Sequence, residues 1–236
     1  MPALLEPGRS FSGLIQAAGV LDLEEAAMLA QSGVHCLGFP LRLDVHTQDQ
    51  SEEEAAYIIA SLPPEVQPVC ITYETSPREV VALCRALGVH CVQLHADLPS
   101  EEGAALLKEV KKLAPNLFLI KSLIVRSDPQ GLAEAASLWQ EHADAFITDT
   151  YDPHTGASGA TGKTHDWDVS RSLAGRINRP LILAGGLGPD NVARAIRYVR
   201  PAGVDAHTGL EDALGRKDPA LVRAFVSEAR RAFADL

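Results

Sequence analysis

The 236-residue sequence lacks the features of several large classes of protein. No run approaches the ~18 apolar residues of a membrane-spanning helix, and the N-terminus has no basic start followed by a long apolar stretch. Basic residues are few, with 21 Lys and Arg against 31 Asp and Glu, and the pI is about 5.2. We therefore expect a cytoplasmic protein that binds neither membranes nor, nonspecifically, nucleic acid.

Signatures of structural metal and nucleotide sites are also missing. The four cysteines show no CxxC or CxxH spacing and lie in apolar runs, which favours buried, reduced thiols. They are Cys36, Cys70, Cys84 and Cys91. Neither GxGxxG nor GxxxxGK[ST] follows the first apolar run, which argues against an open sheet that binds dinucleotides and against a P-loop.

What the sequence does contain is a regular alternation of short apolar runs and amphipathic stretches. Eight such units predict strands followed by helices, and several strands are apolar on both faces, as in a buried parallel sheet. The predicted strands are 14–18, 34–39, 66–73, 89–95, 117–123, 144–149, 180–186 and 203–209. Eight units in a chain of this length favour a single (β/α)₈ TIM barrel domain, α/β in class, over residues 1–236.

In such a barrel, the loops that follow the strands build the active site. The seventh predicted strand ends at Gly185 and Gly186, and the eighth ends at Thr208 and Gly209. Glycine backbone and helix N-termini bind phosphate, and the loops after strands seven and eight are its usual place in this fold. The sequence thus predicts a small phosphorylated ligand, covered by a mobile Gly-rich loop at 150–165.

Four motifs carry a resemblance to a known family. They are "GVHCVQLHAD", "ITDT" followed by "GASGATGKTHDW", "LILAGGLGPDNV" and "GVDAHTGLEDALGRKDPALVRAFV". The chain resembles the phosphoribosylanthranilate isomerases of tryptophan biosynthesis from its first strand to its last helix.

The resemblance implies an Amadori rearrangement that needs no cofactor and no metal. An acid opens a phosphorylated aminofuranose, a base removes the C2′ proton of the resulting imine, and the enolamine becomes a ketone. The family's acid maps to Asp149, whose carboxyl group suits the role if burial raises its pKa. We expect the substrate to be bound by His95, Gln16, Lys163 and Gly162.

The chain departs from the family at the groups that recognise and deprotonate the substrate. Aligning the family's "KICG" on "QAAG" places Gln16 at the lysine and Ala18 at the cysteine that serves as base. The arginine that binds the anthranilate carboxylate maps to Gln48, and Arg42 is out of register. In the last strand, His207 replaces a small residue of "SSG". This pattern predicts a changed base and an altered substrate.

Five histidines fall at predicted strand ends or in the loops after them: His46, His95, His154, His165 and His207. Histidine can accept a proton at neutral pH, so His207 or His46 could replace the cysteine as catalytic base. Alternatives are a metal-dependent enzyme using His46, His95 and His207 with Asp149 or Glu74, and a noncatalytic or regulatory phosphosugar-binding barrel. A fourth alternative is a Schiff base on Lys121. Both monomer and homodimer are compatible with the fold.

Overall fold

A computed structural model describes residues 5–43, 50–125, 128–150 and 166–236 of the chain. It contains a closed barrel of parallel strands in sequential order, β1 to β8, with β1 pairing β8. The strands are β1 (Leu14–Ala18), β2 (Cys36–Pro40), β3 (Gln67–Thr72), β4 (Cys91–Leu94), β5 (Phe118–Val125), β6 (Ala145–Thr150), β7 (Leu181–Leu183) and β8 (Gly203–Ala206). The predicted (β/α)₈ barrel is confirmed.

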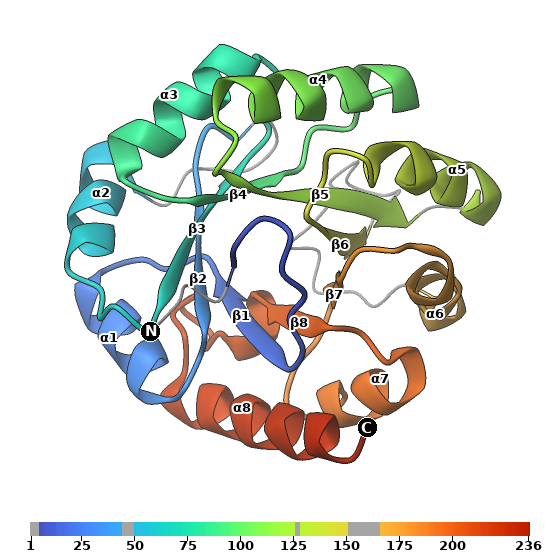
Figure 1. Cartoon of the computed structure of the whole chain (residues 1–236). Coiled ribbons are helices and arrows are strands. Elements are labelled where there is room, and N and C mark those ends of the chain that lie inside the picture. The colour runs from blue at the N-terminus through green and yellow to red at the C-terminus, as the bar shows by residue number, and fades with distance from the viewer. Residues whose placement is uncertain (1–4, 44–49, 126–127, 151–165) are drawn as a thin grey trace.

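Helices surround the strands as an outer ring (Figure 1). They are α1 (Leu23–Gln31), α2 (Glu52–Ala60), α3 (Pro77–Leu87), α4 (Ser100–Leu113), α5 (Pro129–Trp139), α6 (Trp167–Arg176), α7 (Val192–Val199) and α8 (Pro219–Ala234), with a short 3₁₀ helix, η1 (Thr208–Leu210), after β8. Several helices begin where the sequence offers an Asp or Ser cap: Asp22, Ser51, Ser76 and Asp128 each accept a hydrogen bond from a backbone N–H in the first turn.

Two layers of apolar side chains hold the barrel together. One fills the interior, with Leu14, Cys36 and Phe118 among its members. The other lies between the strands and the helices. Successive residues of a strand point alternately into these layers, which is why strands apolar on both faces are buried here. All four cysteines are free and buried.

Two strands end earlier than the sequence predicts, and glycine conformation explains one of them. β7 stops at Leu183 rather than at the predicted 186, because Gly185 and Gly186 have φ angles of 100° and 60° that extended backbone does not adopt. β8 stops at Ala206, and the chain turns into η1 instead of continuing to residue 209. Both loops therefore leave the barrel earlier than predicted.

Register places the side chains of β1 and β8 in shared layers. Gln16 pairs with Asp205, and Ala17 pairs with Ala206. The next residues along the chain are Ala18, the last of β1, and His207, the first after β8. Side chains at matching positions of neighbouring parallel strands point to the same face, so His207 lies in the layer of the barrel that contains Ala18.

Candidate active site

The carboxyl ends of the strands surround a cavity of about 380 Å³. Asp149, His95 and His207 line it, and so do the four residues predicted to bind phosphate, Gly185, Gly186, Thr208 and Gly209. The fold therefore brings these seven predicted site residues to one cavity, although they come from β4, β6, β7, β8 and the segments after them. The predicted residues His46, His154, His165, Gly162 and Lys163 lie outside the described part of the chain. Thr150, the first residue of the predicted loop, is the last residue of β6.

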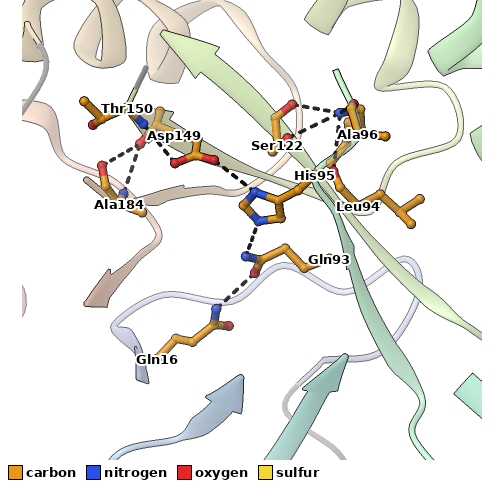
Figure 2. Close-up of polar contacts among 11 residues, drawn as sticks. Gln16, Gln93, Leu94, His95, Ala96, Ser122, Asp149, Thr150 and Ala184 are labelled. Carbon is orange, nitrogen blue, oxygen red and sulfur yellow. Dashed lines mark hydrogen bonds and ion pairs between the residues drawn. The ribbon is translucent and has the colours of Figure 1, made fainter. Parts of the chain in front are cut away.

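Asp149 is held at the end of β6 with both carboxylate oxygens engaged. The Thr150 amide donates to its Oδ1 at 2.9 Å, and Oδ2 lies 2.9 Å from Nδ1 of His95 (Figure 2). Both side chains are buried. A carboxyl group paired with an imidazole in a cavity can hold or release a proton there, which is the chemistry of a general acid.

A row of buried side chains continues from His95 across the barrel interior. Nε2 of His95 lies 2.6 Å from Nε2 of Gln93, and the Gln16 amide donates to Oε1 of Gln93 at 3.0 Å (Figure 2). Gln16 is fully buried, whereas Gln93 lines the cavity. Gln93 was not predicted as a site residue, although its spacing of two residues from His95 puts both on the inner face of the barrel.

Asp205 is a second cavity carboxyl that sequence reasoning missed. It lies on β8, at the position that pairs with Gln16 of β1. Burial raises the pKa of the Asp205 carboxyl to about 6, and the Asp149 carboxyl adds to the rise, while His207, Gln16 and His95 oppose it. Such a pKa lies near neutrality, where a carboxyl can both give and take protons.

His207 stands at the mouth of the cavity, next to the strand whose end carries Ala18. A methyl group built on Gly19 would overlap its Nε2, so the imidazole packs directly on the Gly19 backbone. Nε2 also lies 3.2 Å from Oε1 of Glu211, which in turn accepts from the buried Lys217 ammonium at 2.6 Å. Burial raises the pKa of the Glu211 carboxyl, but hydrogen bonds from His207 and Lys217 outweigh it and lower the pKa to about 2. An ionised carboxylate thus orients the imidazole.

The cavity wall from β2 and β3 is apolar and aromatic. Its described members include Pro40, Ile71 and Tyr73. In an eight-stranded barrel β3 lies across from β7, so this wall faces the glycine loop that was predicted to bind phosphate. Arg42, close to the wall, donates to Glu52 at 2.8 Å and to Glu79 at 3.3 Å.

Lys121 lies outside the cavity. Its ammonium group donates to the carbonyls of Leu94 and Ala96 and stands 4.9 Å from the ring centroid of Trp139, between the barrel and its helices. Burial lowers the pKa of the Lys121 amine to about 8. Lys121 is not among the described residues that line the cavity, so a carbonyl substrate bound there would not reach the amine. The Schiff-base hypothesis is therefore not supported by its position.

Among the described residues, no group of three or more His, Cys, Asp or Glu side chains is arranged to hold a metal ion. His95 is engaged by Asp149 and Gln93, and Glu74 accepts hydrogen bonds from the backbone of Thr75 and Ser76. Nor does any helix in these parts have the length and apolar character to cross a membrane.

Comparisons with known proteins point to one family. The family model described as N-(5'phosphoribosyl)anthranilate (PRA) isomerase matches residues 15–228. An N-(5'-phosphoribosyl)anthranilate isomerase 2 of Methanosarcina mazei is 36% identical over 220 residues, which is 93% of this chain and 95% of that protein. The isomerase of Geobacter sulfurreducens is 36% identical over 92% of this chain and 98% of its own length.

Solved structures lead to the same family. The phosphoribosylanthranilate isomerase of Thermotoga maritima superposes with a TM-score of 0.76 at 29% identity, covering 92% of this chain and 98% of that one. A phosphoribosylanthranilate isomerase in complex with reduced 1-(o-carboxyphenylamino)-1-deoxyribulose 5-phosphate gives a TM-score of 0.74 at 27% identity, with the same coverage. The chain belongs to the phosphoribosylanthranilate isomerase family.

Proposed function

We propose that the protein isomerises an N-substituted 5-phosphoribosylamine by an Amadori rearrangement, with Asp149 as acid and His207 as base. The observation that carries the proposal is the meeting of three parts in one cavity: the Asp149–His95 pair, His207 beside Gly19, and the glycine loops after β7 and β8. The complex of a family member with a phosphorylated ketose product analogue supports the same class of substrate.

In the proposed reaction, protonated Asp149 gives its proton to the ring oxygen as the C1′–O bond breaks and the nitrogen lone pair forms the C1′–N double bond. His207 then removes the proton from C2′, the electron pair of that C–H bond forms the C1′–C2′ double bond of the enolamine, and the π pair of the C1′–N double bond returns to nitrogen. Protonation at C1′ and loss of the 2′-hydroxyl proton give the ketone. The acid and base each contribute about 10²- to 10⁴-fold in rate.

The position of His207 in the cavity, in addition to its imidazole chemistry, favours it as the base. It shares a layer with Ala18, where the family resemblance expects the cysteine, and Glu211 fixes its ring. His46, the other candidate, belongs to the segment outside the described residues. The same cavity suits a substrate with phosphate at the loops after β7 and β8 and its nitrogen substituent against Pro40, Ile71 and Tyr73.

The nitrogen substituent is proposed to differ from anthranilate. Two observations support this: the arginine expected to bind the carboxylate maps to Gln48, and the nearby Arg42 is already paired with Glu52 and Glu79. Either a monomer or a homodimer can carry the site, and the family includes the dimeric enzyme of Thermotoga maritima.

The test is an assay of purified protein in D₂O on freshly made phosphoribosylanthranilate and on N-aryl and N-alkyl phosphoribosylamines. Isomerisation that passes through the enolamine places one deuterium on C1′ of the ketose, which mass spectrometry detects. Asp149→Asn is the matched control, because it keeps the shape of the side chain and removes the proton. Phosphosugar binding without deuterium incorporation on any substrate would contradict the proposal and favour a noncatalytic binding barrel.

A further inference from the structure

A row of polar side chains runs between the two cavity carboxyls. Asp205 pairs with Gln16 in the register of β8 and β1, Gln16 donates to Gln93, Gln93 lies 2.6 Å from His95, and His95 lies 2.9 Å from Asp149. All five residues are buried, with Gln16 at 0% exposure and Gln93 at 2%. Water therefore has little access to the middle of the row, and the partners of these groups are one another.

The hydrogen bonds along such a row all run in one donor-to-acceptor direction. An amide has one donor end and one acceptor end, and a neutral imidazole has one N–H and one lone pair, so each contact fixes the next. In the direction observed, Gln16 donates to Gln93, and the Gln93 amide nitrogen faces Nε2 of His95. Nε2 must then accept, which leaves the proton on Nδ1, where it is donated to an ionised Asp149.

The opposite direction arises when the side-chain amides of Gln16 and Gln93 both rotate by half a turn, which exchanges their oxygen and nitrogen atoms. Nε2–H of His95 then donates to the oxygen of Gln93, the Gln93 amide donates to Gln16, and Gln16 donates to Asp205. Nδ1 now carries the lone pair, so it accepts from a protonated Asp149. The separation of 2.6 Å between Gln93 and His95 suits this direction, because it is short for two nitrogens.

Two unpaired atoms lie at the Asp205 end of the row. Oε1 of Gln16 and Oδ1 of Asp205 are buried, and neither has a hydrogen-bond partner in the described structure. These are neighbouring acceptors that both need a donor. In the first direction, a proton on Asp205 is donated to Oε1 of Gln16. In the second direction, the rotated Gln16 amide donates to Asp205.

We propose that Gln16 and Gln93 couple the protonation of Asp205 to that of Asp149, so that one proton is held by one carboxyl or the other. Gln16 and Gln93 are positioning residues, and the protonation of Asp205 decides whether Asp149 carries the proton. The role of Asp149 in catalysis rests on the proposed function, whereas the coupling itself does not. The groups that act electrostatically on Asp205 are His207, His95 and Asp149, and Cys36 is its buried neighbour.

The coupling is tested on the free protein by ¹⁵N NMR of the His95 ring, assigned by comparison with His95→Gln. Gln16→Lys places a side chain that can only donate beside Gln93, so the proton of His95 should move to Nδ1. Gln16→Glu places one that can only accept, so the proton should move to Nε2. In the wild-type protein, the ratio of the two tautomers should change with pH between about 5 and 8, and Asp205→Asn should abolish that change.

Gln67→Glu, which adds a carboxylate on β3 outside the row, is the control and should leave the His95 tautomer as in the wild type. The same tautomer in Gln16→Lys and Gln16→Glu would overturn the coupling. If either variant does not fold, the pH dependence of wild type against Asp205→Asn decides, and a ratio that is unchanged with pH in the wild type overturns it. Because no substrate is present, this outcome is independent of whether Asp149 proves to be an acid in the turnover assay.

Discussion

The imidazole of His207 rests on the backbone of Gly19, with no room for a side chain between them. Gly19 has a φ angle of 75°, so its conformation also favours glycine. The residue that follows Ala18 thus seats the proposed base directly beside the position where the family resemblance expects a cysteine. The contact brings one departure from the family, His207 after β8, next to another, Ala18 at the end of β1.

We expect Gly19→Ala to displace His207 and to lower kcat at least tenfold. The substitution also places alanine in a left-handed conformation, which costs about 1 kcal/mol of folding stability. Gly88→Ala is the matched control, because Gly88 has a φ angle of 70° and open space around it. Both variants should lose similar stability in thermal unfolding, and only Gly19→Ala should lose turnover. Equal kcat values in the two variants would argue against His207 as base.

His207→Ala should reduce kcat by about 10²- to 10⁴-fold, as expected for loss of a general base. Ala18→Cys in the same background should restore part of the rate, because the thiol would enter the same layer of the barrel from the neighbouring strand. Steady-state kinetics on whichever phosphoribosylamine the D₂O assay shows to be isomerised measures both effects. Full activity of His207→Ala would transfer the role of base to another residue.

Asp149→Asn should strongly reduce turnover while leaving phosphosugar binding in place. The amide keeps the size of the carboxyl group but cannot give a proton to the ring oxygen, so the loss should be about 10²- to 10⁴-fold in kcat. Calorimetric titration with ribose 5-phosphate checks that the phosphate loops still bind. Retained turnover would exclude Asp149 as the acid.

Asp205 should make the wild-type protein less stable as pH rises. Its folded pKa of about 6 lies above the ordinary value, so the folded state binds the proton more tightly, and stability falls between pH 4 and pH 7. The difference of about 2 pKa units corresponds to about 3 kcal/mol. Asp205→Asn should remove this dependence in urea unfolding measured at both pH values.

A control of opposite sign is available at Asp22. The backbone N–H of Glu25 lowers the pKa of the Asp22 carboxyl, and Arg216 adds to this effect. Its stabilising contribution is therefore present above the ordinary pKa and is lost at lower pH. Asp22→Asn should destabilise the protein more at pH 7 than at pH 3. The two variants together separate the local effect of Asp205 from a general response of the protein to pH.

The sequence predicted the barrel because its main determinant is local: apolar strands and capped helices alternate eight times. The strand-end positions also predicted that His95 and His207 lie at one end of the barrel, whereas Asp149 was assigned from the family resemblance. Contacts that depend on register were not predicted. Asp205 lies beside Gln16 only because the barrel closes β8 onto β1. One sign was available in the sequence: Asp205 stands two residues before His207, and Gln93 stands two residues before His95, which puts each pair on the same inward face.

Barrel closure also bears on how the chain folds. Leu14 pairs with Gly203, so one side of β1 has no strand partner until nearly the whole chain has left the ribosome. During synthesis β1 is an exposed edge, able to pair with strands of other chains. We expect the pairing of β8 with β1 to be the step that ends this exposure. A protein truncated before residue 203 should therefore be far more prone to aggregation than one truncated within α8.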